Sequence, residues 1–104
     1  MENQVKSLQY LTVISSTKNK EKILKLLREQ SAEAVNVIYG KGSVKESLLA
    51  QAFGLDWDSK KAVITGIIET DMAKEVIEIL KDKYNFNKAN TGIAFSISVD
   101  GLLF

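Results

Sequence analysis

Three residue types are absent from this chain of 104 residues, and each absence excludes a kind of chemistry. Without cysteine, the chain has no disulfide, no thiolate nucleophile and no cysteine-bound metal. Without histidine, it lacks the commonest general base and the commonest transition-metal ligand. Without proline, no turn depends on a cis-proline bond. We therefore expect neither a catalytic site nor a metal site.

Charge and hydrophobicity narrow the class of protein further. Fourteen Lys and Arg balance thirteen Asp and Glu, and the net charge of +1 gives no bulk attraction to nucleic acid or to an anionic membrane. Residues 1–6 lack the apolar core of a signal peptide, and no apolar run approaches the roughly 20 residues that span a bilayer. We expect a single domain over 1–104 that is cytoplasmic, binds no nucleic acid and is not inserted into a membrane.

The first half of the chain predicts a strand, a helix and a second strand. β-Branched and aromatic residues over 8–15 are typical of a strand. Possible N-caps over 16–19 precede apolar residues at helical spacing, which predicts a helix with one buried face. The alternation over 34–39 predicts the second strand, and this strand ends at Gly40 and Gly42.

The connection after the second strand contains a predicted short helix over 43–53. Ser43 and Glu46 form a capping box, and apolar residues follow at helical spacing. The wide apolar stripe of this helix is open to two interpretations. We favour packing over the sheet or at a subunit seam, whereas the alternative is an exposed partner-binding surface. The residues of that surface would be Leu49, Phe53 and Trp57.

The second half of the chain repeats the pattern of the first. A strand is predicted over 62–68, followed by a helix that Thr70 or Asp71 can cap. Large apolar residues alternate with small ones over 93–99, which predicts a last strand with one buried face. The resulting order is βαββαβ. We therefore predict an α+β, ferredoxin-like fold, with an antiparallel sheet and both long helices on one face.

Two segments resemble the nitrogen-regulatory P-II family of signal-transduction proteins. Residues 38–45, Ile-Tyr-Gly-Lys-Gly-Ser-Val-Lys, are similar to the end of the second strand and the start of the T-loop in that family. Residues 87–95, Asn-Lys-Ala-Asn-Thr-Gly-Ile-Ala-Phe, are similar to its B-loop. The resemblance implies a homotrimer that senses an effector in clefts between its subunits and regulates a partner protein.

The resemblance also implies which residues bind the effector, which would be ATP, ADP or AMP. Glycines in both loops let main-chain N–H groups converge on a phosphate without a Cβ in the way. The implied nucleotide-binding residues are Gly40, Lys41, Gly42, Lys88, Asn90, Thr91 and Gly92. Each loop also has a simpler interpretation, because the first can be a bend that ends a strand and the second a tight turn.

The chain departs from the family pattern where the family binds its ligands. Val44 replaces a glutamine that helps to bind magnesium and 2-oxoglutarate, and Ile93 replaces a B-loop lysine. Residues 100–104 contain no counterpart of the family's phosphate-binding arginines. No tyrosine lies between Gly40 and Gly66, so we expect no uridylylation. Two functions stay open: a divergent P-II-like regulator, or a trimeric structural or interaction module that has lost nucleotide binding.

Overall fold

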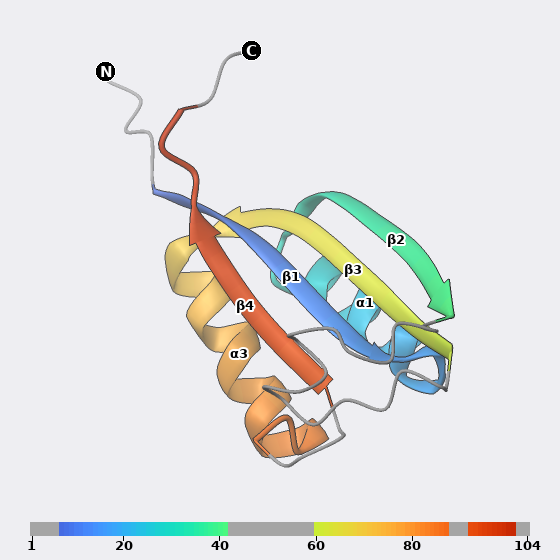
Figure 1. Ribbon diagram of the computed structural model, residues 1–104. Coiled ribbons are helices and arrows are strands. Elements are labelled where there is room, and N and C mark those ends of the chain that lie inside the picture. Colours follow the sequence, from blue (N-terminus) through green and yellow to red (C-terminus); the bar gives the residue numbers. More distant parts are fainter. Residues whose placement is uncertain (1–6, 42–59, 88–91, 102–104) are drawn as a thin grey trace, which may run out of the picture.

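The computed structural model, which describes residues 7–41, 60–87 and 92–101, has a four-stranded antiparallel sheet with two helices on one face (Figure 1). The elements are β1 (Leu8–Ser16), the 3-10 helix η1 (Thr17–Asn19), α1 (Lys20–Glu29), β2 (Glu33–Lys41), β3 (Lys60–Glu69), α3 (Thr70–Tyr84) and β4 (Gly92–Ser98). The strand order in the sheet is β2-β3-β1-β4. The predicted ferredoxin-like α+β fold is confirmed. The predicted helix over 43–53 lies outside the described residues.

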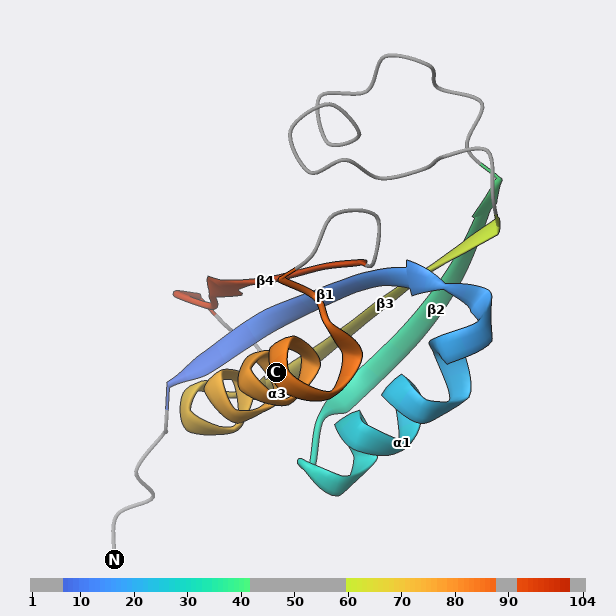
Figure 2. The same cartoon turned by 90° about the horizontal axis from the view of Figure 1, so that it is seen from below.

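The main hydrophobic core lies between the sheet and the two helices (Figure 2). Val13 of β1 pairs with Ile64 of β3, and both side chains are fully buried. Alternate strand residues point to one face, so the neighbours of these two at every second position also face the helices. The buried residues of this core are Leu11, Val13, Ile23, Leu26, Leu27, Ala62, Ile64, Ile68, Ala73, Val76 and Leu80. Neither helix of the described chain is long and apolar enough to cross a membrane.

The face of the sheet away from the helices, called here the open sheet face, carries a second set of apolar side chains. Thr12 of β1 pairs with Thr65 of β3 and with Phe95 of β4, so all three point away from the helices. Other residues join this face at every second position along their strands. The central residues of the open sheet face are Tyr10, Thr12, Ile14, Ile38, Val63, Thr65, Ile67, Ile93, Phe95 and Ile97. The register also places Asn36, Lys61 and Glu69 on this face. The sheet is therefore apolar on both faces.

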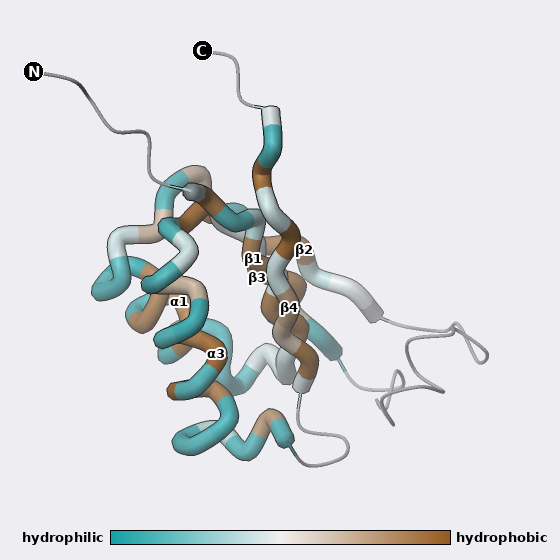
Figure 3. Tube along the Cα trace, turned by 90° about the vertical axis from the view of Figure 1, so that its left-hand side faces the viewer, coloured by the Kyte–Doolittle hydropathy of each residue, from teal (hydrophilic) through white to brown (hydrophobic). Residues whose placement is uncertain are grey.

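The last strand, β4, corrects one sequence-based expectation. The alternation over 93–99 predicts that the large apolar residues form the buried face. In the structure these residues lie on the open sheet face, where Phe95 is 40% exposed and Ile97 is 57% exposed. The smaller Ala94 and Ser96 pair with Val13 and Leu11 of the core, so they face the helices. Figure 3 shows both helices on the same side of the strands. Small side chains on that side leave room for α3, which contacts β4, so helix packing and not side-chain size decides which face is covered.

The start of α3 differs from the predicted cap. The sequence predicts Thr70 or Asp71, but the N-cap is Glu69, which makes no side-chain cap hydrogen bond. Thr70 is the first helical residue, and its Oγ1 and its backbone amide each donate a hydrogen bond to the Ser7 carbonyl oxygen, both at 3.1 Å. The residue before β1 therefore anchors the first turn of α3, which is a long-range contact that the local sequence does not reveal.

A β-bulge interrupts the pairing of β2 with β3. The register shifts between Glu33 and Asn36, and Ala34 has a left-handed backbone with a φ of 53°. Gly66 of β3 lies beside this bulge, where an added Cβ would lie 3.3 Å from Cγ2 of Val35. The bulge thus needs a small residue on the neighbouring strand and an unusual backbone at Ala34.

Substitutions of the exposed Ala34 test this backbone conformation. Glycine adopts a positive φ freely, so we expect Ala34→Gly to be at least as stable as the wild type. We expect Ala34→Val to lower the free energy of unfolding by about 1–2 kcal/mol, because a β-branched residue strongly resists this conformation. Urea unfolding measures both variants. Ordinary strand propensity favours valine over alanine over glycine, and that order would contradict the bulge.

Candidate ligand-binding site

The two loops predicted to bind nucleotide leave the sheet at the same end. Gly40 of β2 pairs with Lys61 of β3, which also pairs with Ser16 of β1, and the adjacent Ser15 pairs with Gly92 of β4 (Figure 1). Neighbouring strands are about 4.8 Å apart, so three strand spacings separate the two glycines by about 14 Å. Within one chain, Gly40 and Gly92 therefore lie at opposite edges of this end of the sheet.

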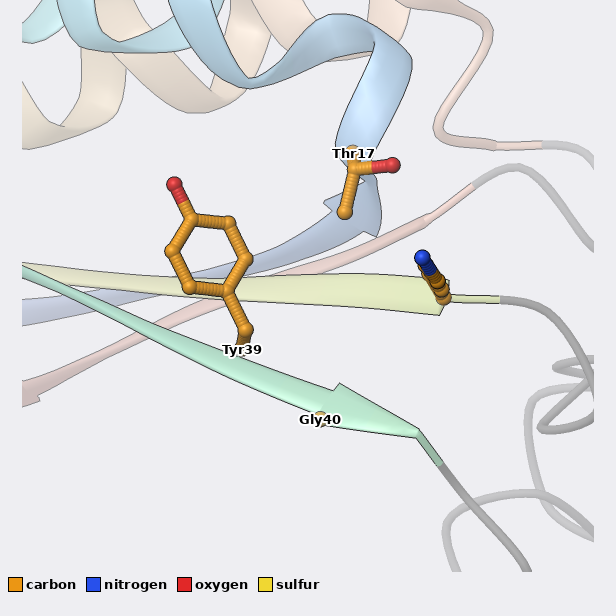
Figure 4. A pocket seen from close by; sticks show the side chains of 4 residues that line it. Thr17, Tyr39 and Gly40 are labelled. Carbon is orange, nitrogen blue, oxygen red and sulfur yellow. The ribbon is translucent and has the colours of Figure 1, made fainter.

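A pocket of about 490 Å³ opens beside Gly40 (Figure 4). Its walls are Thr17 of η1, Tyr39 and Gly40 of β2, and Lys60 of β3. The Tyr39 side chain rises from the sheet on the side where Thr17 lies (Figure 4). Lys60 is on the same face of β3 as Ala62, the residue that pairs with Tyr39. The pocket thus combines an ammonium group, a hydroxyl group, an aromatic ring and an unhindered stretch of backbone. These groups suit an anionic ligand that has a planar apolar part.

A lysine of α1 holds the tyrosine of this pocket. Lys20 Nζ donates a hydrogen bond of 2.6 Å to Tyr39 Oη and lies 5.1 Å from the centre of the ring. The same ammonium lies 3.1 Å from the Oε2 atom of Glu21. The hydrogen bond to Tyr39, followed by the one to Glu21, raises the pKa of Lys20 above its ordinary value of 10.5. Although Tyr39 is 59% exposed, its orientation is therefore supported by a charged partner.

The two predicted site glycines that the structure describes have opposite surroundings. An added Cβ on Gly40 would meet no heavy atom of the described residues within 4 Å. An added Cβ on Gly92 would lie 2.5 Å from Cζ of Phe86 and 2.9 Å from the carbonyl oxygen of Ile14. Packing of the chain therefore requires glycine at position 92. At position 40 no packing contact within the described chain requires it, so the open backbone there is available to a ligand.

The other predicted site residues are only partly described. Lys41 is the last residue of β2, and its backbone pairs with that of Lys60. Seven predicted residues lie outside the described part of the chain, namely Gly42, Leu49, Phe53, Trp57, Lys88, Asn90 and Thr91.

Sequence reasoning missed Thr17, Lys20 and Lys60 as neighbours of Gly40. Tyr39 was visible only as the last residue of an alternating strand, although it directly precedes Gly40. These residues come from η1, α1, β2 and β3, and they meet only because the sheet pairs β2 with β3 beneath η1. No spacing in the sequence connects them.

The sequence itself matches no model of a known protein family, and no curated protein matches it. Solved structures are similar in fold. One is a protein from Thermus thermophilus described as PII-like and signalling, with a TM-score of 0.66 and 15% identity over 89% of this chain and 87% of that chain. Another, from Pediococcus pentosaceus and of unknown function, has a TM-score of 0.65 and 14% identity over 96% of this chain and 99% of that one.

The nitrogen-regulatory PII-like protein CPII from Thiomonas intermedia is similar in two states. Its apo form has a TM-score of 0.66 and 16% identity, covering 89% of both chains. Its form bound to ADP, AMP and acetate has a TM-score of 0.64 and 20% identity, covering 95% of this chain and 94% of that chain. The resemblance predicted from the sequence is therefore confirmed at the level of the fold, which is that of PII-like signalling proteins.

Matched substitutions of the two glycines test the contrast between them. We expect Gly92→Ala to lower the free energy of unfolding by about 1–3 kcal/mol, because the methyl group overlaps Phe86 and the Ile14 carbonyl oxygen. We expect Gly40→Ala to change it by less than about 0.5 kcal/mol, because the methyl group enters open space. Urea unfolding measures both, with Gly101→Ala, also in open space, as the control.

A second substitution identifies the source of the loss. Trimming the ring in the double variant Phe86→Leu/Gly92→Ala should recover part of the stability, so that the two effects are not additive. Strict additivity, or a Gly92→Ala variant as stable as the control, would show that Phe86 does not press on position 92.

Proposed function

We propose that this protein is a P-II-like regulatory protein of the cytoplasm that binds an adenine nucleotide beside Gly40 and controls a partner protein. One observation carries the proposal: Gly40 and Lys60 border the same pocket, and no described atom lies within 4 Å of where a Cβ on Gly40 would be. The sequence resembles the start of the P-II T-loop at this same end of the sheet. The similar CPII protein binds ADP and AMP. A chain without histidine or cysteine offers few groups for catalysis, which supports regulation over an enzymatic role.

The nucleotide phosphates would bind at the backbone of Gly40. The absence of a Cβ lets an anion approach the main chain there, and the Lys60 ammonium on the same pocket wall would offset its charge. Lys41 and Gly42 continue the same stretch of backbone. The Lys60 ammonium would thus supply positive charge to the phosphates, which in the P-II pattern comes from the arginines and the B-loop lysine.

The second loop would come from a neighbouring subunit. Gly92 is about 14 Å from Gly40 across the sheet, which is too far for both loops to hold one phosphate group. In a homotrimer, Lys88, Asn90 and Thr91 of one subunit would approach the Gly40 pocket of the next. An effector bound in this way would contact two subunits, so its binding would depend on the assembly of the trimer.

The open sheet face would form the centre of that trimer. Four of its large side chains are 40–61% exposed, namely Tyr10, Ile38, Phe95 and Ile97. The charged residues that the register places on this face are Lys61 and Glu69, near the two ends of β3, so the middle of the face is uncharged. Burying a large apolar side chain is worth about 1.5–3 kcal/mol, so a closed symmetric assembly of this chain is favoured. That the assembly has three subunits rests on the family resemblance.

A charge on the open sheet face tests the assembly. We expect Ile97→Asp to convert the trimer to monomers, because an unpaired carboxylate at an apolar interface loses its hydration without compensation. Light scattering after size-exclusion chromatography measures the mass. Met72→Asp is the matched control, since Met72 is 39% exposed on α3, on the helix side. A wild-type monomer, or equal dissociation of both variants, would refute the proposed interface.

Titration calorimetry with ATP, ADP and AMP tests the effector. We expect Gly40→Val and Lys60→Gln each to weaken nucleotide binding at least about tenfold, because one fills the open backbone approach and the other removes a positive charge. Gly101→Ala and Lys74→Gln are the controls, because both positions are exposed and lie away from the pocket. If binding is unchanged in the Gly40 and Lys60 variants, the nucleotide lies elsewhere.

A second candidate function is the trimeric structural or interaction module without an effector. The observation that favours it is the position of Ile93, which stands where the P-II pattern has a lysine. Ile93 is only 7% exposed and packs with Ile14 and Val63. It adds to a hydrophobic cluster and offers no charge to a phosphate. An intact trimer that gives no binding heat with ATP, ADP or AMP would establish this second function over the first.

A further inference from the structure

Residues of α1 and α3 line a groove of about 310 Å³. Both helices lie on the side of the sheet away from the open sheet face (Figure 2). Lys22 and Lys25 of α1 and Lys83 of α3 border it, and they are called here the three groove lysines. Ile79 and Tyr84 of α3 line the groove between them, and both are only partly buried. The groove therefore combines a basic border with an apolar floor.

The three groove lysines differ from other lysines of the same helices. Lys20 is engaged by Glu21 at 3.1 Å, and Lys81 is engaged by Glu78 at 3.1 Å. Within the parts of the chain that the structure describes, the three groove lysines make no hydrogen bond or ion pair. One carboxylate, that of Glu29, also borders the groove. The groove thus has an excess of positive charge, although the net charge of the whole chain is only +1.

We propose that this groove binds an acidic, amphipathic segment of a partner protein. Its carboxylates would pair with the three groove lysines, and its apolar side chains would cover Ile79 and Tyr84. A nucleic acid would use the lysines but leave the apolar floor in contact with water, and the small net charge of the chain would attract it weakly. A polypeptide that carries acidic and apolar residues together matches both chemical features of the groove.

The groove and the open sheet face are on opposite sides of the sheet. A trimer closed over the open sheet face would therefore leave the groove accessible. The pocket beside Gly40 is also separate, because it shares no described lining residue with the groove. This proposal stands whether or not the protein binds a nucleotide.

A labelled peptide tests the groove directly. The probe is a fluorescein-labelled peptide of about 12 residues that repeats Glu-Glu-Leu, and fluorescence anisotropy measures its affinity for the full-length protein at about 50 mM salt. We expect Lys25→Gln/Lys83→Gln to weaken binding at least about tenfold. The matched control is Lys18→Gln/Lys74→Gln, which removes the same charge from positions outside the groove. Conservative replacement of the first pair by arginine should retain binding.

Other results would overturn the proposal. Equal weakening by the groove pair and the control pair would mean that general electrostatic attraction binds the peptide. A peptide with serine in place of leucine that binds equally well would show that the apolar floor is not used. Tighter binding of single-stranded RNA of equal charge would identify a polyphosphate as the better occupant. No binding by the folded wild type, with its fold verified by circular dichroism, would also refute the groove as a docking site.

Discussion

The pairing of β1 on both of its edges is the constraint on which the rest of the structure depends. Its nine residues pair with β3 over their whole length, and most of them also pair with β4. A shift of one residue in either register would exchange the residues of the helix side with those of the open sheet face. The same registers bring the last residues of β2 and the first residue of β4 to the same end of the sheet, at its two opposite edges.

This sheet is apolar on both faces, and the two faces have different fates. The helices cover one face and build the main core around residues such as Val13 and Ile64. The other face retains exposed Phe95 and Ile97 in the single chain. Neither α1 nor α3 covers this second apolar face, which the assembly proposed above would bury.

Three surfaces of this molecule therefore carry three different kinds of chemistry. The open sheet face is apolar and suits copies of the same chain. The pocket beside Gly40 joins an ammonium group to open backbone and suits a phosphorylated effector. The groove between the helices joins three lysines to an apolar floor and suits an acidic segment. Because the described residues of these surfaces do not overlap, the three proposals for assembly, effector binding and partner binding are compatible with one another.

Local sequence patterns were enough to predict the order and type of the described elements. The alternation over 34–39 and the helical spacing around Leu26 match the repeats of a strand and of a helix, and these segments form β2 and α1 in the structure. The caps were less predictable. Thr70 forms its hydrogen bonds with Ser7, which lies 63 residues away along the chain and could not be foreseen from local spacing.

The candidate site was predictable only at the glycines. The short motif around Gly40 is visible in the sequence, whereas Lys60 and Thr17 reach its pocket through strand pairing and the position of η1. By itself, the sequence determined the ferredoxin-like order and excluded chemistry that needs cysteine or histidine, since both follow from composition and short-range periodicity. Only the tertiary structure decided which face of β4 is covered, and that Gly92 serves packing whereas Gly40 stays open. Those outcomes depend on Phe86, Ile14 and α3, whose positions are set by long-range packing and not by neighbouring residues.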